Sequence, residues 1–114
     1  MSKSNLALNR AIAEKIMGLT LFQEPLYGDW YHQTESGAQF AVPNYAGDPR
    51  ATMAVVEEMR KTHVIFVTFG DESPCGVETL SRADGATFET DAETFPRCLC
   101  LAALRARGHS TEEL

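Results

Sequence analysis

The sequence contains no long apolar run. None of its hydrophobic stretches approaches the roughly 20 residues that a helix needs to span a bilayer, and its first residues enter an amphipathic pattern without the apolar centre of a secretory signal. Cysteine is scarce as well, and Cys75, Cys98 and Cys100 are an odd number. Cys98 and Cys100 lie roughly 160° apart around a predicted helix, where they cannot easily bridge. We therefore expect a reduced, cytoplasmic protein without a membrane partner.

Basic residues are outnumbered by acidic ones. The chain has 10 Lys and Arg against 16 Asp and Glu, which gives a formal net charge of −6. Long nucleic acids are poor partners for such a chain, because binding by counterion release needs a basic surface. A small phosphate-bearing ligand stays possible, since two or three well-placed arginines can hold it whatever the total charge.

Recognisable catalytic and metal motifs are also missing. The chain has no Walker, GxGxxG or HExxH pattern. Its possible metal ligands, Cys75, Cys98, Cys100 and His109, match no compact ligand spacing. We expect no metal, no cofactor and no enzymatic activity, and the role of Cys75 stays open.

The residues that are present predict one domain over residues 1–114. The hydrophobic fraction of 44% and the charged fraction of 23% are near globular averages, and a chain of this length can bury a core of its own. Leu8, Ile12 and Ile16 recur every four residues, which predicts an amphipathic helix that ends at Gly18.

Aromatic and apolar stretches interrupted by proline and glycine follow this helix. They are typical of paired strands, at residues 19–23, 29–33 and 38–42. Asp48 and Pro49 then predict the N-cap and first position of a second helix that runs to about Lys61. On this helix Glu57 and Lys61 are spaced to form an ion pair.

The stretch from His63 to Phe69 is apolar on both of its alternating sides. A strand of this kind is covered on both faces. This predicts helices on both sides of the sheet, or a helix on one side and a partner subunit on the other. Further along, Asp84-Gly85 is a strong hairpin signal between two more strands. The whole pattern indicates an α+β fold with a mostly antiparallel sheet and three helices.

The third predicted helix, within residues 94–108, is apolar on two sides. At 100° per residue one side collects Phe95, Cys98, Leu99, Ala102 and Ala106. Cys100, Leu101 and Leu104 lie near the other side, and we expect them to form a homo-oligomer interface. A neighbouring helix of the same chain is the alternative cover. The polar tail, residues 109–114, is expected to fray.

Four residues are candidates for ligand binding. Arg97 lies among apolar positions and must find an anion, a carboxylate partner or solvent, whereas Arg105 in the last turn is also expected from the helix dipole alone. Trp30 and Tyr45 could stack on a planar base. The simpler interpretation is that these two aromatic residues pack a sheet edge or fill the rim of the core.

Three stretches together resemble the phage ABA-sandwich domain family. They are residues 8–18 (LNRAIAEKIMG), 51–59 (ATMAVVEEM) and 92–104 (AETFPRCLCLAAL). These are core-packing signatures without catalytic groups. Met53 stands where the family commonly has tryptophan, Leu19 follows Gly18 where tryptophan is also common, and Arg97 stands in a usually apolar stretch. The resemblance implies a three-layer α/β/α sandwich encoded by a phage or prophage and acting in the host cytoplasm.

The resemblance also suggests a function. Some small oligomeric phage proteins, such as the Thoeris anti-defence proteins, bind and sequester nucleotide second messengers of bacterial immunity. Kinship with them would make this chain a non-enzymatic sponge for a cyclic nucleotide-type signal. Its pockets would lie between subunits and be lined by Arg105 or Arg97 with Trp30 or Tyr45. The alternatives are a phage accessory module that binds another protein and, last, a small nucleotide-modifying enzyme.

Overall fold

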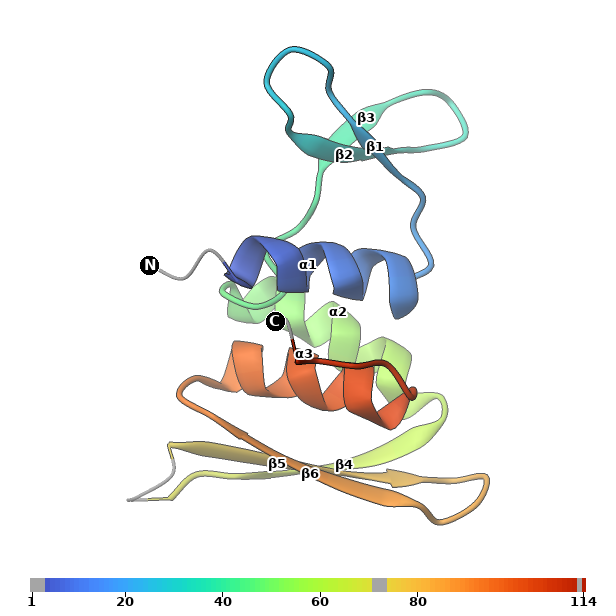
Figure 1. Ribbon diagram of the computed structural model, residues 1–114. Coiled ribbons are helices and arrows are strands. Elements are labelled where there is room, and N and C mark those ends of the chain that lie inside the picture. Colours follow the sequence, from blue (N-terminus) through green and yellow to red (C-terminus); the bar gives the residue numbers. More distant parts are fainter. Residues whose placement is uncertain (1–3, 71–73, 113) are drawn as a thin grey trace.

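Over residues 4–70, 74–112 and 114, which the computed structural model describes, the chain forms three helices and two three-stranded antiparallel sheets (Figure 1). The elements in chain order are α1 (Ser4–Lys15), β1 (Leu21–Gln23), β2 (Trp30–Gln33), β3 (Gln39–Ala41), α2 (Pro49–Arg60), β4 (His63–Thr68), β5 (Cys75–Ser81), β6 (Thr87–Ala92) and α3 (Phe95–Ala106). The helices lie between the two sheets. The predicted α+β fold with antiparallel strand pairing is confirmed.

The first helix forms where the apolar repeat predicts it. Leu8, Ile12 and Ile16 are all buried, so the predicted stripe is the core-facing side of α1. Gly18 adopts a positive φ of 72°, a conformation that favours glycine. This lets the chain reverse while the Leu19 amide donates to the Ala13 carbonyl at 2.8 Å.

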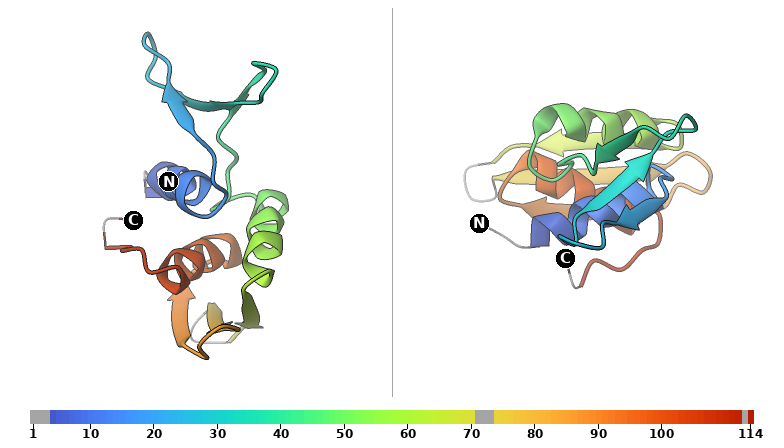
Figure 2. Two further views of the ribbon diagram at one scale, coloured as in Figure 1. Left: turned by 90° about the vertical axis from the view of Figure 1, so that its right-hand side faces the viewer. Right: turned by 90° about the horizontal axis from the view of Figure 1, so that it is seen from above.

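The strands β1, β2 and β3 form a small sheet that projects from the helical layer (Figure 2). Its ladder pairs Leu21 with His32 and His32 with Phe40. Leu21 packs against the core, and the Arg10 guanidinium of α1 lies 4.8 Å from the centre of the Trp30 ring. Few side chains therefore attach this sheet to the rest of the protein.

The second helix begins as predicted. The Asp48 carboxylate accepts the Arg50 amide at 3.0 Å and caps α2. The predicted Glu57–Lys61 ion pair is wrong, because Lys61 Nζ lies 2.9 Å from Glu58 Oε1. Glu57 instead faces Arg60, at 3.6 Å. Side chains three apart are neighbours on a helix just as those four apart are.

The larger sheet runs in the order β4–β5–β6. Its second hairpin turns at the predicted place, where the Asp84 carboxylate accepts the Ala86 amide at 3.0 Å and Gly85 has a φ of 75°. The side chains that point from this sheet toward α3 form one apolar cluster with it, comprising Cys75, Val77, Cys98, Leu99 and Ala102.

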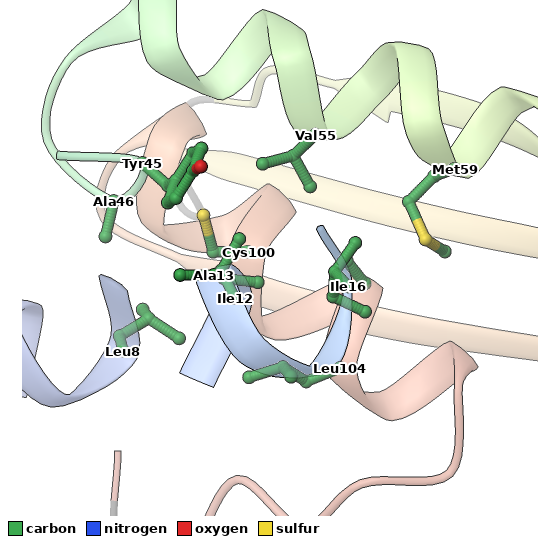
Figure 3. Close-up of a cluster of buried hydrophobic side chains, with 11 residues drawn as sticks. Leu8, Ile12, Ala13, Ile16, Tyr45, Ala46, Val55, Met59, Cys100 and Leu104 are labelled. Carbon is green, nitrogen blue, oxygen red and sulfur yellow. The ribbon is translucent and has the colours of Figure 1, made fainter. Parts of the chain in front are cut away.

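The three helices bury a second cluster between them (Figure 3). The α1 stripe packs there on Cys100 and Leu104 of α3 and on Val55 and Met59 of α2. The second apolar side of α3 is thus covered by helices of the same chain. The tail, which we expected to fray, folds back as well. Leu114 packs against this cluster, and its main-chain oxygen accepts a hydrogen bond from Arg97.

The expectation of helices on both sides of the larger sheet is wrong, whereas its alternative, a partner subunit on the far side, stays a prediction. The strand β4 is covered by a helix on one face only, and Phe66, whose side chain lies on the other face, stays 50% exposed. The reason is the position of α1. Because α1 packs on α3, no helix among the described residues is left to cover the far face of the larger sheet.

Candidate functional site

A groove of about 440 Å³ runs between α2 and the edge strand β4. One wall is the helix and the other is the strand, which follows α2 after a connection of two residues. The groove is lined by Met53, Val56, Arg60, His63, Val64, Ile65, Val67, Arg82 and Phe95. Its volume lies within the range of about 300–1,000 Å³ that is usual for small-molecule sites.

The groove is positively charged at the corner where α2 ends and β4 begins. Arg60 comes from the last turn of α2, and Arg82 is placed beside it because its amide donates to the Thr62 carbonyl at 3.0 Å. Arg107, at the end of α3, reaches the same corner and donates from Nη2 to Thr62 Oγ1 at 3.4 Å. Three arginines therefore gather in a chain whose formal net charge is −6.

The arginines at this corner are loosely held. Arg60 faces Glu57 at 3.6 Å, but both side chains are well exposed, and exposed pairs of this kind contribute little to stability. The Arg82 guanidinium has no hydrogen bond or ion pair with any residue that the structure describes. Both guanidinium groups can turn toward an anion without breaking a strong contact.

His63 lies in the floor of this corner and is buried. Burial lowers its pKa below the ordinary value, and the nearby charge of Arg107 lowers it further, while Asp84 acts in the opposite direction. The ring is therefore neutral at neutral pH. Its Nδ1 lies 2.7 Å from Thr62 Oγ1, which holds the ring in place.

The rest of the groove is apolar. Met53 and Val56 of α2 and Phe95, at the start of α3, supply apolar side chains to its lining. Met53 is 49% exposed. The combination of a cationic end and an apolar wall suits a ligand with an anionic group and a planar or apolar body.

A smaller depression of about 220 Å³ lies on the far face of the larger sheet. Its lining includes Glu78, Glu89 and Asp91, with Glu78 directly opposite Glu89 in the β5–β6 register. Like charges at this spacing repel. This acidic depression is unsuited to a phosphate-bearing ligand.

The four predicted ligand residues are not brought together. Tyr45 is 3% exposed and lies among the helices. Burial raises its pKa, and the nearby Cys100 raises the pKa further. It is the core residue of the simpler interpretation, as Figure 3 shows. Trp30 stands on the small sheet beneath the Arg10 guanidinium.

The two predicted arginines of α3 have partners within the chain. Arg97 donates to Asn5 Oδ1 at 2.8 Å and to the main-chain oxygen of Leu114. Arg105, about 12 Å further along the helix axis, donates to Thr111 at 3.2 Å and to Thr90 at 3.4 Å. No hydrogen bond or cation–π contact in the described parts of the chain joins any two of Arg97, Arg105, Trp30 and Tyr45.

The predicted interface residues have a different role. Cys100 and Leu104 are fully buried against α1 and α2, and Leu101 is partly buried beside them. They are core residues, because α1 supplies the cover that we had assigned to a second subunit. An interface between copies must use another surface.

The thiols are buried in two places. Cys98 donates toward the Thr90 carbonyl at 3.2 Å and lies with Cys75 between the larger sheet and α3, whereas Cys100 lies among the helices. Burial raises the pKa of Cys98 to about 12, with Cys75 adding to the effect, and burial alone raises that of Cys100 to about 12. In the described ranges, no three His, Cys, Asp or Glu side chains gather as metal ligands.

Sequence reasoning missed the groove. In the sequence, Arg60 is an arginine in the last turn of a helix, and the favourable interaction with the helix dipole is enough to explain an arginine at that position. Arg82 joins it solely through the β4–β5 register, which pairs His63 with Ser81. Nothing in the local sequence specifies that register, so the arginine pair could not be predicted.

The fold and these clusters define a small α+β sandwich. The sequence model of the Phage ABA sandwich domain family matches residues 10–104. The chain belongs to this family of phage proteins. No curated protein sequence matches the chain.

A solved structure shares the fold. It is the crystal structure of a phage protein from Bacillus cereus ATCC 14579, with a TM-score of 0.75 and 21% sequence identity. The match covers 93% of this chain and 89% of the other. Over the described residues, no helix is both long and apolar enough to cross a bilayer.

Proposed function

We propose that this phage protein binds and sequesters a small nucleotide signal of bacterial anti-phage immunity in the host cytoplasm, without turning it over. The observation that carries the proposal is the groove between α2 and β4, where Arg60 and Arg82 border an apolar wall. Membership of a phage family supports the biological setting.

The chemistry of the groove supports an anionic ligand. Arginine binds phosphate oxygens through two parallel N–H donors, which gives strength and orientation. The apolar side chains of Met53, Val56 and Phe95 can cover a base or a ribose edge. The neutral ring of His63 adds a polar contact and no charge.

The absence of turnover is part of the proposal. The residues that line the groove include no carboxylate. His63 is their one candidate for acid–base chemistry, and its Nδ1 is already engaged with Thr62 Oγ1. A site with arginines and no placed base suits binding better than catalysis.

The proposal is tested by calorimetry against cyclic di- and trinucleotides and cyclic ADP-ribose isomers. We expect heat with at least one of them. Arg60→Ala and Arg82→Ala should each weaken binding about 10- to 100-fold, the value of a hydrogen bond to a charged group. Arg50→Ala is the matched control, because Arg50 lies on the exposed start of α2, outside the groove.

Two results would contradict this proposal in different ways. No heat with any member of the panel would remove the nucleotide ligand. A ligand recovered chemically altered after incubation would instead support the enzyme alternative. Chromatography of the recovered ligand separates these outcomes.

A second function is favoured by the exposed apolar side chains near β4. Phe69 is 69% exposed, and Phe66 and Met53 are about half exposed. Such a patch is typical of a protein-binding surface, which suits the accessory-module alternative. A single stoichiometric partner captured from infected cells, and lost on Phe69→Ser, would support it.

A further inference from the structure

We propose that β4 is the pairing edge of a symmetric dimer. In this dimer β4 aligns antiparallel with β4 of a second copy, and the two sheets β4–β5–β6 join into one continuous sheet. The inference does not rest on the proposed nucleotide ligand, but it uses Met53 and Val67, which also line the groove, so the groove would lie beside the second copy. It replaces the α3 surface that the sequence predicted as the interface.

The first support is the direction of the main-chain groups of β4. The Arg82 amide bonds the Thr62 carbonyl, and bonded and non-bonded pairs alternate along an antiparallel ladder. By this alternation His63, Ile65 and Val67 point their amide and carbonyl groups away from β5. None of these groups has a main-chain partner in the part of the chain that the structure describes.

The second support is the contrast between the two edges of the sheet. The strand β4 reads HVIFVT and carries no proline, lysine or carboxylate. Proline and charged residues, lysine above all, are the residues by which proteins usually protect an open edge from pairing. The opposite edge strand β6 carries Glu89 and Asp91. One edge is protected against pairing and the other is not.

The third support is the apolar area at the unprotected edge. Phe69, Phe66, Met53 and Val67 are 69%, 50%, 49% and 40% exposed. With about 200 Å² for a large side chain, these fractions leave roughly 400 Å² on each copy. Two copies would contribute at most about 800 Å² of apolar area, and the paired strand main chain adds to it; specific interfaces bury ~1,200 Å² or more.

The symmetry of the edge favours a second copy over another protein. An antiparallel pair of identical strands is self-complementary about a two-fold axis. Placing Ile65 opposite Ile65 of the second copy sets His63 opposite Val67, so all the outward groups find partners within the strand. On the far face this register sets Phe66 beside Val64 of the second copy, which covers exposed apolar surface.

Charges at the rim of α2 are compatible with this arrangement. The helix α2 lies over β4 at the edge of the molecule (Figure 2). The helix α2 of the second copy would therefore lie across the two-fold axis from α2 of the first. Glu57 and Arg60, which are both exposed on this helix, supply one charge of each sign. The two copies can form reciprocal ion pairs there and do not repel each other.

The direct test is the mass of the protein in solution without any ligand. We expect the wild type at twice the 12.6 kDa of one chain. Val67→Lys, which places a charge on the pairing edge, should return the mass to that of one chain. Thr87→Lys, at an exposed position of the opposite edge strand β6, is the matched control and should keep the dimer mass.

A second test checks the register of the two β4 strands by the gain of a covalent bond, so it does not depend on a variant that weakens the dimer. On oxidation, an equimolar mixture of Val64→Cys and Phe66→Cys should give a covalent dimer, because these positions face each other as a closely spaced pair. Neither variant alone should do so, and the native thiols are buried. A wild type with the mass of one chain, a Val67→Lys variant with the wild-type mass, or a mixture that does not cross-link would each overturn the proposal.

Discussion

The two sheets of this protein are both three-stranded and antiparallel, but they differ in the length of their ladders and in the support that the helices give them. The sheet β4–β5–β6 presents one face to α2 and α3 and shares a buried cluster with α3. The sheet β1–β2–β3 touches the helical layer mainly through Leu21 and through the contact of Arg10 with Trp30. We expect the larger sheet to be the more stable one, because burial of apolar side chains supplies most of the stability of a fold. The candidate groove lies on the well-supported sheet.

The largest expected effect comes from the cluster between the larger sheet and α3. Leu99 is fully buried there, and Leu99→Ala should lower the free energy of unfolding by about 2–5 kcal/mol. Phe40→Ala on the small sheet is the comparison, because Phe40 is 52% exposed, and it should cost less than about 1 kcal/mol. Urea denaturation of both variants measures the two values. Equal losses would contradict the difference in support.

The thiols give the next effect. All of them are free and buried, so a thiol reagent should label none in the native protein and Cys75, Cys98 and Cys100 after denaturation. The pKa of both Cys98 and Cys100 is about 12 in the folded state, above the ordinary 9.0. Stability should therefore be complete below about pH 9 and fall as the pH rises toward 12, because the unfolded thiols ionise first. Rapid labelling of the native protein would show that the helical layer opens.

His63 gives a smaller effect, on the acid side. Its folded pKa lies below the ordinary value of about 6.5, mainly because the ring is buried. The unfolded chain therefore takes up a proton before the folded chain does. Stability should be complete above about pH 6.5 and decrease as the pH falls below it. Thermal melts of His63→Gln should lose this part of the pH dependence, and an unchanged slope would show that His63 does not cause it.

The smallest effect is expected at the attachment of the small sheet. The contact of Arg10 with the Trp30 ring is partly exposed, and such contacts contribute about 0.5–1 kcal/mol. Trp30→Ala should therefore leave the global unfolding almost unchanged while making residues 20–42 more susceptible to protease. Arg10→Lys, which keeps the charge, is the matched control. A large fall in global stability would mean that the small sheet is part of the main core.

The fold was predictable where local patterns determine it. The stripe of Leu8, Ile12 and Ile16, the cap at Asp48 and the turn at Gly85 all depend on neighbouring residues, and all are confirmed. The layers were harder to predict, because α3 is apolar on two sides and only one of them packs on the sheet. The second side of α3 could be covered by α1 or by another subunit, and the sequence alone does not distinguish these.

The candidate site could not be predicted for a related reason. Arg60 and Arg82 are 22 residues apart and meet only through the strand register that also bonds Arg82 to Thr62. The residues that looked suited to a ligand are occupied in other ways. Arg97 donates hydrogen bonds to Asn5 and Leu114, and Tyr45 is in the core. Chemical type alone did not show which arginines were available.

Residue-resolved hydrogen exchange tests the difference between the sheets most directly. We predict that the β5 amides of Val77 and Thr79 exchange only with global unfolding, because their strand is buried beneath α3. The β2 amides of Tyr31 and His32 should exchange much faster, by local opening of the small sheet, and their rates should not change in Leu99→Ala. Equal protection of β2 and β5 would contradict the account, because it would show that both sheets belong to one cooperative unit.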